Sequence, residues 1–578
     1  MKADDDYLRS IYGGEKQYIV PVFQRIYSWE PKHWKELWRD LEYLLEPEAF
    51  NEEHFIGTFV FMAKKLSPGK IPNYVLIDGQ QRIVTIAIIL AMIRNLARTI
   101  GKNKKREDLS KFADEIQETY LINKYKKGRE VYKVISRGDD RALLIKIINN
   151  EEFEKEEENE RISKSFEFFN KKIEKFLKES EDDSLENLKK LRNIIMYQLP
   201  LVTITLEEKD NPFTIFETLN ERGLDLEESD LIRNYVFMKL NIEEQDEFNI
   251  KKWIPFENTL RDIGFNARQL TTFFRHYLMR NGSYVKKNGV YLQFKKVKYE
   301  NLNDLLKDLK KYAEFYKWIH KSNTAPKELA ESLLRIKYLN IGTSYPLILH
   351  LLNRWKVKEI SEREFQEMLL NLESFVIRRS ICGETTRGYH RTFPSAINAL
   401  KDTKLKQSFI EYFCKKRWPG DEDFETNLYN FELYKRDRDK AFLILKTIEK
   451  ELSPKETVKF DGLSIEHLMP QTINDDKDGK VWMKMLGVDW LKIHEELLHT
   501  IGNLTLSGYN INMSNKPYNV KKKKLEESNL KLNKYFQKID KWDKDEIEKR
   551  SKILIKSILR LWPNPCIPCI KKTDPKLK

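Results

Sequence analysis

The sequence contains little cysteine, with four residues among 578. They are Cys382, Cys414, Cys566 and Cys569, and the last two form a Cys-Ile-Pro-Cys stretch near the end. A single pair of this kind, without a second pair elsewhere, is weak support for a zinc site. So few cysteines indicate reduced thiols in a cytoplasmic protein and not a disulfide scaffold.

The sequence also lacks a long apolar run. No stretch of about 18 uncharged apolar residues is present, so we expect no membrane-spanning helix. The first residues, MKADDDYLRSIYGG, lack the apolar segment of a signal peptide. No internal repeat is found. These absences together predict a cytoplasmic protein with no membrane partner.

Charge is abundant and biased towards lysine and arginine. The chain has 40% hydrophobic and 34% charged residues and a formal net charge of +14. Residues 451–578 contain 25 lysines and arginines against 18 acidic residues, including the run Lys521–Lys524. Such a region suits a polyanion, although a solvated helix face has the same composition. Charge alone does not decide between these interpretations.

The chain is long enough for roughly three or four domains. Period-two patterns predict strands, and a pattern with spacing three and four predicts a helix over Pro31–Glu46 and many helices over 212–450. The expected strands are Gln17–Trp29, His54–Ala63, Asn73–Ile77 and Gln198–Leu206. Short strands and a basic helix are expected after Pro454. The predicted domains are 1–240, 241–450 and 451–578.

A short polar motif, Asp78-Gly-Gln-Gln-Arg82, joins one of these strands to a long apolar helix. The start of a helix offers free N–H groups and a positive dipole end, both of which suit phosphate. Arg82 can grip phosphate oxygens with two N–H groups, Asp78 can bind a metal or position a water, and the glutamines can hydrogen-bond a base or a phosphoryl oxygen. Taken alone, the five residues are better explained as a turn followed by an ion pair.

The flanking motifs favour a ligand site. VPVFQRIYSW precedes the polar motif, FIGTFVF lies between them, and FTIFETLNERGLDLEESDLIRNYVF (Phe213–Phe237) follows. In this order they closely resemble the N-terminal domain of GmrSD-type modification-dependent restriction proteins, which is related to the ParB-like nucleotide-handling fold. The resemblance implies a nucleoside triphosphate site with NTPase activity, although it does not identify the nucleotide. The implied residues are Gln24, Arg25, Asp78, Gly79, Gln80, Gln81, Arg82, Asn220 and Arg222.

A second motif set lies in the last domain, in LSIEHLMPQT and HTIGNLTLSGYNINMSNKPYNVKKKKLEES. Singly, a strand histidine is usually a core residue and loop asparagines usually make turns. In this order they resemble the HNH, or ββα-metal, nuclease. The resemblance implies His467 as general base, Asn503 as the residue that holds its tautomer, and Glu466 and Asn512 as ligands of Mg²⁺ or Mn²⁺. Asn510 and Asn515 are close enough to be confused with Asn512. The lysines suited to backbone phosphates are Lys516, Lys521, Lys522, Lys523 and Lys524.

The fold class implied is an α/β ParB-like N-terminal domain, a mostly α-helical middle and a C-terminal HNH-like domain, α-rich overall. The function implied is a nucleotide-regulated, metal-dependent endonuclease that cleaves or nicks modified phage DNA in bacterial defence. SspE-like and BrxU-like proteins are relatives of the GmrSD-type family that the chain resembles. The alternative is a nucleotide-switched DNA-binding regulator that does not cleave. The sequence leaves open the DNA modification, the nucleotide and the direction of its effect, the form of the cut and whether the chain forms a homodimer.

Overall fold

The structure is a computed structural model that divides into two compact units, Met1–Ile254 and Pro255–Lys578. It describes residues 2–22, 24, 26–49, 52–64, 69–155, 157, 160–180, 183–206, 227–240, 242–401, 404–454, 458–509 and 513–566. The boundary between the units lies close to the predicted end of the first domain. The division of the remainder into a middle and a last domain stays a prediction.

The first unit is built on a mixed six-stranded sheet with the order β1-β6-β3-β4-β2-β5. Its strands are β1 Lys2–Tyr7, β2 Gln17–Ile19, β3 Gly57–Ala63, β4 Asn73–Asp78, β5 Val134–Ile135 and β6 Pro200–Leu206. β6 is antiparallel to β1 and parallel to β3, and β4 is antiparallel to β3. β2 runs parallel to both β4 and β5. The predicted strands at 54–63, 73–77 and 198–206 are therefore confirmed within a few residues.

The strand predicted over Gln17–Trp29 is much shorter in the structure. β2 ends at Ile19, although the Val20 N–H still donates to the Ile135 carbonyl at 2.8 Å. Pro21 has no N–H to continue the ladder, so the chain leaves the sheet there. The prediction was wrong for the described residues 20–22, 24 and 26–29, which form a loop instead of sheet.

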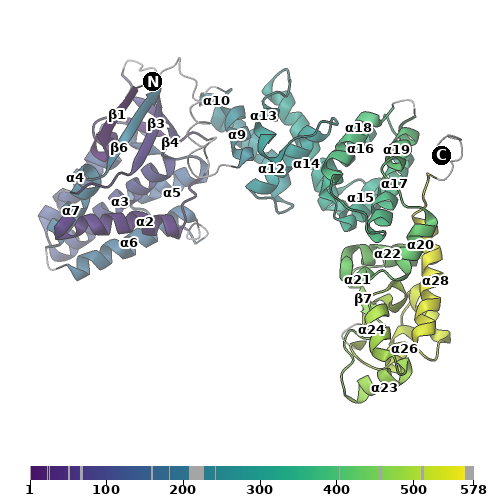
Figure 1. Cartoon of the computed structure of the whole chain (residues 1–578). Helices are drawn as coiled ribbons and strands as arrows, with labels where there is room; N and C mark the ends of the chain where they lie inside the picture. Colours follow the sequence, from purple (N-terminus) through teal and green to yellow (C-terminus); the bar gives the residue numbers. More distant parts are fainter. Residues whose placement is uncertain are drawn as a thin grey trace. The chain divides into compact units, whose positions relative to one another are not determined.

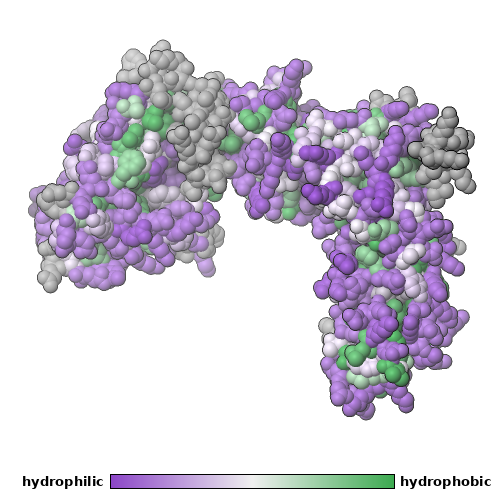
Figure 2. All heavy atoms as spheres, viewed as in Figure 1, coloured by the Kyte–Doolittle hydropathy of each residue, from purple (hydrophilic) through white to green (hydrophobic). Residues whose placement is uncertain are grey.

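A layer of helices packs on one face of this sheet, with α3 at its centre (Figure 1). The helices of the unit are α1 Leu8–Tyr12, α2 Pro31–Leu45, α3 Gln80–Lys104, α4 Glu107–Ile116, α5 Gly138–Asn149, α6 Arg161–Glu179, α7 Ser184–Tyr197, α9 Glu228–Phe237 and α10 Ile242–Phe248. By length and composition α3 could cross a membrane, but 72% of its most apolar window is buried inside the unit. A buried core helix explains its apolar sequence. On the face that Figure 2 shows, hydrophilic residues dominate over α2 and α6.

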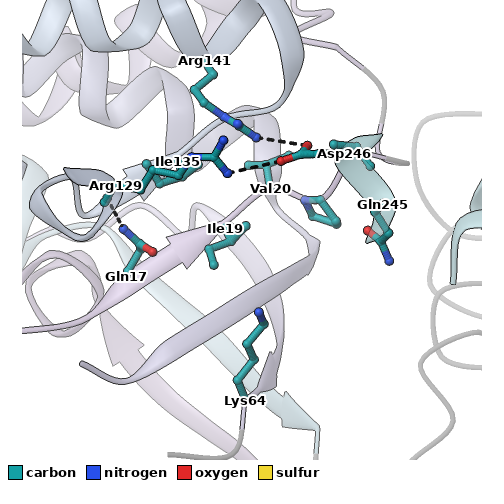
Figure 3. A pocket seen from close by; sticks show the side chains of 11 residues that line it. Gln17, Ile19, Val20, Lys64, Arg129, Ile135, Arg141, Gln245 and Asp246 are labelled. Carbon is teal, nitrogen blue, oxygen red and sulfur yellow. Dashed lines mark hydrogen bonds and ion pairs between the residues drawn. The ribbon is translucent and has the colours of Figure 1, made fainter. Parts of the chain in front are cut away.

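The opposite face of the sheet carries a smaller apolar cluster and a pocket. Val60, Val75, Ile77 and Leu206 pack together there, with Leu231 of α9 against them. Alongside β2, a pocket of about 230 Å³ lies between the strand and α10 (Figure 3). Tyr18 of β2 belongs to the helix-side core. Because side chains alternate along a strand, its neighbours Gln17 and Ile19 face the pocket side.

The second unit is helical apart from one small sheet in its described part. Its helices are α12 Ala267–Met279, α13 Val290–Phe294, α14 Leu302–His320, α15 Lys327–Leu339, α16 Tyr345–Lys356, α17 Glu362–Ile381, α18 Tyr389–Ala399, α19 Leu405–Cys414, α20 Asp421–Tyr429, α21 Leu433–Arg436, α22 Arg438–Leu452, α23 Lys477–Leu486, α24 Trp490–Leu497, α26 Tyr518–Glu526, α27 Lys531–Lys534 and α28 Lys544–Leu561; α11 Ile254–Arg261 begins at the unit boundary. The long helical region predicted from residue 212 and the α-rich fold class are therefore confirmed for the described residues.

The small sheet consists of β7 Ser464–His467 and β8 Leu504–Ser507, which pair antiparallel. It lies beside a core that includes Trp482, Tyr518 and Trp542. α26, which follows β8, contributes Tyr518 to this core. Two strands followed by a helix agree with the local order expected for a ββα arrangement, and the HNH assignment itself stays a prediction.

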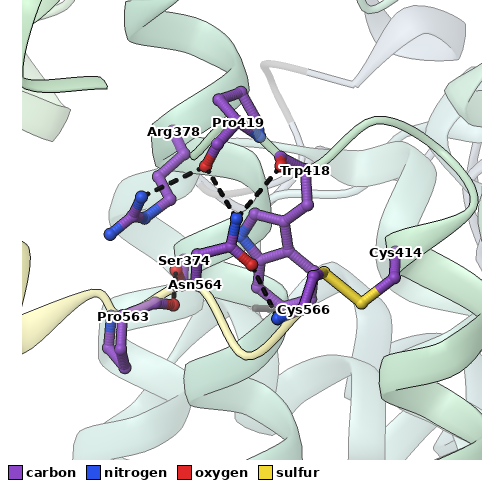
Figure 4. The surroundings of a disulfide bond; sticks show 8 residues. All are labelled: Ser374, Arg378, Cys414, Trp418, Pro419, Pro563, Asn564 and Cys566. Carbon is purple, nitrogen blue, oxygen red and sulfur yellow. Dashed lines mark hydrogen bonds between the residues drawn. A yellow bond between two sulfur atoms is a disulfide. The ribbon is translucent and has the colours of Figure 1, made fainter. Parts of the chain in front are cut away.

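A disulfide corrects the prediction that all the cysteines are reduced. Cys414, at the end of α19, is bonded to Cys566, 152 residues further along (Figure 4). The chain reaches Cys566 through a segment docked on buried Arg378, whose Nε donates to the Trp562 carbonyl at 2.7 Å. This docking brings together two thiols whose distance in sequence gives no sign of pairing. Cys382 is free, and Cys569 lies outside the described residues.

Candidate functional site

The polar motif of the first unit forms a tight strand-to-helix turn. Gly79 is the N-cap of α3 and has φ 93°, a left-handed conformation that glycine adopts without strain. A Cβ built at this position would lie 2.7 Å from the ring of Phe59. The Asp78 carboxylate accepts the Gly79 N–H at 2.8 Å, and the Asp78 side chain is 41% exposed. The predicted turn is confirmed, with an accessible acid at the mouth of α3.

The glutamines of the motifs bind backbone groups of neighbouring segments. Gln24 Nε2 donates to the Ile77 carbonyl at 2.9 Å. Gln81 Oε1 accepts the Ser28 N–H at 2.7 Å, and Gln81 Nε2 donates to the Ile26 carbonyl at 3.3 Å. These bonds tie the loop after β2 to the end of β4 and the start of α3. The motif residues meet in space, although Gln24 and Gln81 are engaged with the backbone and both are buried.

Arg82 acts as a clamp on the start of β3. Its Nη1 donates to the Ile56 carbonyl at 2.8 Å and its Nη2 to the Thr58 carbonyl at 2.7 Å. The guanidinium also lies 5.1 Å from the Phe59 ring centroid and 3.8 Å from the Asp78 carboxylate. Burial lowers the pKa of Arg82, while Asp78 acts in the opposite direction. The structure gives this arginine a structural role, and its predicted phosphate contact is untested.

Gln80, the first residue of α3, is buried. Arg25, Asn220 and Arg222, the other predicted nucleotide ligands, lie outside the described residues. The described part of the predicted nucleotide site therefore consists of Gln24 and Asp78 to Arg82.

In the second unit, His467 lies at the end of β7 and is 4% exposed. Its Nε2 is 3.1 Å from Nδ1 of His499, and its ring meets the ring of Tyr434 edge-on at 4.5 Å. Burial lowers the pKa of His467 to about 3, and the neighbouring His499, Lys521, Arg438 and His494 add to the effect. His467 is therefore a neutral imidazole at pH 7, the form that can accept a proton.

His499 is the more exposed member of this pair. It stacks on Tyr434 with ring centroids 5.7 Å apart. The guanidinium of Arg438 also lies over the Tyr434 ring, 4.8 Å from its centroid. Burial lowers the pKa of His499 below its ordinary value, with Glu432 opposing the shift. The group formed by His467, His499, Tyr434 and Arg438 is called the histidine site below.

Sequence reasoning missed Tyr434 and Arg438. They belong to α21 and α22, upstream of the predicted domain start at residue 451. No spacing rule connects them with His467, because the contact arises from the packing of α21 and α22 near β7. The only sequence signal is the basic composition of YKRDRDK (Tyr434–Lys440).

Glu466 forms a buried ion pair. Lys521 Nζ donates to Glu466 Oε1 at 2.7 Å and to the His467 carbonyl at 2.6 Å. Burial raises the pKa of Glu466 and lowers that of Lys521, because it penalises charge on either group. Lys521 is fully buried and its ammonium is held by Glu466, an environment that the sequence did not indicate; its predicted phosphate contact is untested.

The other predicted lysines remain at the surface. Lys523 is exposed, and Lys522 and Lys524 are partly exposed beside Asp540 and Glu527. Lys516 is 3.1 Å from Asp478 and about half exposed, with a side-chain exposure of 54%. These four lysines are available to a polyanion, and their DNA contacts stay predictions.

Asn503 is fully buried and locks the chain after His467. Its Oδ1 accepts the Met469 N–H at 2.7 Å, and its Nδ2 donates to the carbonyls of Met469 and Leu498 at 3.0 and 2.9 Å. Trp542 Nε1 also donates to Oδ1 at 3.1 Å. These bonds position the loop that follows His467, and the predicted bond to the histidine ring is not among them.

Only part of the predicted metal site lies among the described residues, so the metal ligands stay a prediction. Among the described residues, no three His, Cys, Asp or Glu side chains gather as ligands would. The Glu466 oxygen that a cation would need is held by the Lys521 ammonium. Asn512 and Asn510 lie outside the described residues, and Asn515 is exposed.

Comparison with known families gives two matches in chain order. Residues 8–237 match the GmrSD restriction endonuclease N-terminal domain, and residues 418–557 match the GmrSD restriction endonucleases C-terminal domain. No curated protein matches the chain significantly. The second match includes all four residues of the histidine site and supports a DNA endonuclease. Because the two matches together cover more than half of the sequence, the chain belongs to the GmrSD restriction endonuclease family.

Proposed function

We propose that this protein is a nucleotide-regulated, metal-dependent endonuclease that cleaves or nicks modified foreign DNA in bacterial defence. Family membership supports the endonuclease. The observation that carries the proposal is the histidine site, where a buried neutral imidazole lies 3.1 Å from a second, more exposed one. Two adjacent nitrogen bases of this kind provide a proton acceptor and a path by which the proton leaves.

The proposed role of His467 is general base. Hydrolysis of a phosphodiester needs water to lose a proton while its oxygen attacks phosphorus and the leaving alkoxide departs. The pKa of His467 is low because burial and neighbouring cations disfavour its charged form. A bound DNA phosphate would bring negative charge beside Arg438 and His467 and so raise that pKa. The substrate itself would then make the histidine a stronger base.

The proposed role of His499 is to take that proton towards solvent. It is less buried than His467, and the two ring nitrogens are in hydrogen-bond contact. Tyr434 holds both rings, edge-on to His467 and stacked on His499. Arg438 would add a positive charge that suits the scissile phosphate.

The metal requirement rests on family resemblance to the HNH-type site, which would use Mg²⁺ or Mn²⁺. The buried Glu466–Lys521 pair does not support it, and this pair favours the alternative function, a nucleotide-switched DNA-binding regulator without cleavage. The deciding assay incubates plasmid, hydroxymethylated, glucosylated and phosphorothioate DNA with each cation and each nucleoside triphosphate, with and without EDTA. Binding without cleavage under every condition would establish the regulator.

The proposed nucleotide site is at Asp78 to Arg82, supported by the exposed acid and the N-terminus of α3. Because Arg82 clamps two backbone carbonyls, its removal would damage the fold as well as any phosphate contact. Asp78→Asn is the sharper variant, since its carboxylate contacts the Gly79 N–H and is partly exposed. Calorimetry with each nucleotide should show altered affinity or lost hydrolysis for this variant.

Our first prediction concerns the base. His467→Ala should lower DNA cleavage by about 10²- to 10⁴-fold, because a general base contributes that much to a rate. His390→Ala is the control, since His390 of α18 packs against Tyr284 and is not among the groups that act on His467. Thermal unfolding of both variants controls for the buried position of His467. Cleavage by well-folded His467→Ala at the wild-type rate would remove the base assignment.

A further inference from the structure

The pocket beside β2 holds an unusual arrangement of charges. Arg129 and Arg141 approach one carboxylate, that of Asp246 in α10 (Figure 3). The distances are 3.3 Å from Arg129 Nη1 and 3.6 Å from Arg141 Nη2. Lys64 also lines the pocket, so the lining contains three basic side chains and one acidic one. Among the described lining residues, two guanidinium groups therefore face one carboxylate, that of Asp246.

The two arginines are fixed by different supports. Arg141 is 20% exposed, and its Nε donates to the Ser136 carbonyl at 3.0 Å, which directs the rest of the guanidinium towards Asp246. Arg129 is 70% exposed, while its backbone carbonyl accepts the Gln17 side-chain N–H at 2.6 Å. Arg141 is therefore anchored through its guanidinium and Arg129 through its backbone. Asp246, in contrast, is held by two long and partly exposed ion pairs, which are weak.

We propose that this pocket binds a phosphate group of a small ligand, and that the phosphate takes the place of the Asp246 carboxylate between Arg129 and Arg141. A phosphate presents more oxygens and more charge to paired guanidinium groups than a carboxylate does. The volume of about 230 Å³ accommodates a phosphate or diphosphate and is below the range of about 300–1,000 Å³ usual for whole organic ligands. The source is free phosphate or diphosphate, or the phosphate end of a nucleotide.

Displacement of the Asp246 carboxylate would alter the helical segment at the end of the first unit. Asp246 is in α10, and the chain continues from Phe248 through the π-helical turn Asn249–Trp253 to the unit boundary at Ile254. Gln245 of the same helix also lines the pocket and donates to the Phe237 carbonyl at 3.1 Å. Phosphate binding would thus loosen the helix that leads into the second unit. This step deepens the proposed nucleotide regulation and rests on it only for the identity of the ligand.

The test is titration calorimetry of the full chain with inorganic phosphate, pyrophosphate and nucleoside triphosphates. Asp246→Asn removes the competing charge and should bind pyrophosphate about tenfold more tightly, whereas Arg141→Gln should bind about tenfold more weakly. Arg98→Gln, which breaks the surface pair with Asp114, is the matched control and should bind like wild type. A merely structural ion pair predicts that Asp246→Asn does not gain affinity, and that result would overturn the proposal.

The ligand sources are separated by the same titrations. Tight binding of pyrophosphate by itself assigns the pocket to free diphosphate, and binding of triphosphates alone assigns it to a nucleotide. Amide hydrogen exchange over residues 244–253 should be faster in the presence of the bound ligand than in the same buffer without it. If Asp246→Asn binds none of the three ligands, the pocket is not a phosphate site, even where DNA cleavage is intact. If binding is found but cleavage does not respond to it, the site stands and nucleotide regulation through it fails.

Discussion

A single buried imidazole should make the stability of the second unit depend on pH. The folded pKa of His467 is about 3, whereas an ordinary histidine titrates near 6.5. Between these values the unfolded chain binds a proton that the folded chain does not, so stability rises with pH across the window and is complete above about 6.5. It is lost as the pH falls from 6.5 towards 3.

Denaturant unfolding of wild type and His467→Gln at a series of pH values measures this contribution. The variant should show a shallower loss of stability between pH 6.5 and the onset of general acid unfolding. Equal slopes for the two proteins would mean that His467 titrates normally, and the neutral base would then need another explanation.

Two neighbouring lysines should behave oppositely when they are replaced. Lys521→Ala leaves the buried Glu466 carboxylate without its cation and should cost about 3–5 kcal/mol of unfolding free energy. Lys523→Ala, on the exposed side of α26, should change stability by less than about 0.5 kcal/mol. DNA binding should show the opposite pattern. Lys523→Ala should reduce the salt dependence of DNA binding, and Lys521→Ala should leave that dependence unchanged. Equal stability losses would contradict the burial of Lys521.

For single residues, the sequence predicted local backbone structure well, but it predicted poorly which distant groups a side chain contacts. The turn at Asp78-Gly79 follows from local backbone chemistry, and it was predicted. The partners of Arg82 are carbonyls at Ile56 and Thr58, which no local rule connects with it. The burial of Lys521 did have a signal, because it follows buried Tyr518 by three residues and precedes buried Leu525 by four, on one helix face.

Among the elements, the β4–α3 turn gives the sharpest prediction. Gly79→Ala should destabilise the first unit by about 1–3 kcal/mol or more, because the residue needs positive φ and its Cβ would meet Phe59. Gly69→Ala is the control, since Gly69 has φ 79° but open space around it. Chemical denaturation of both variants separates backbone strain from the steric contact. A loss for Gly79→Ala no greater than for Gly69→Ala would show that α3 tolerates the contact.

Element boundaries were predictable where side-chain periodicity was strong. α2 was predicted over Pro31–Glu46 and runs over Pro31–Leu45, with Pro at its first turn. β2 was predicted to end at Trp29 but ends at Ile19, because apolar composition continues after Pro21 while strand pairing does not. The packing of α21 and α22 near β7 could not be predicted. The sequence pattern of these helices indicates that one face is buried, but it does not indicate which element that face contacts.

For the whole molecule, the disulfide predicts a response to reductant. The Cys414–Cys566 bond joins residues 152 positions apart, and disulfides typically contribute about 2–4 kcal/mol to stability, with long loops towards or above the upper end. Wild type should therefore unfold at lower temperature in dithiothreitol, and Cys414→Ser should unfold at that lower temperature with or without it. Mass spectrometry of the protein from cells reports whether the bond forms in the reducing environment that the sequence predicts. Identical melting of oxidised and reduced wild type would show that docking on Arg378 holds the tail unaided.

The family, an α-rich architecture and strands in the first unit could be predicted, because ordered motifs and periodicity carry that information, whereas the mixed order of the sheet could not. The histidine site could be predicted only in part. His467 stood in a motif, whereas Tyr434 and Arg438 came from a region where helical periodicity indicates core and nothing more. The metal ligands, the nucleotide and the DNA modification stay predictions, since each depends on a bound partner.

The position of β6 in the sheet has a consequence for the protein during its synthesis. Among the strands that the structure describes, β1, at Lys2–Tyr7, pairs with β6 alone, and β6 ends at Leu206. At roughly 5–20 residues per second, the first strand waits on the order of 10–40 s for the ribosome to deliver its partner. Asp4, Asp5 and Asp6 lie on this waiting strand, and their charges discourage it from pairing with another nascent chain. An amino-terminal fragment that stops before Pro200 would keep that edge unpaired permanently.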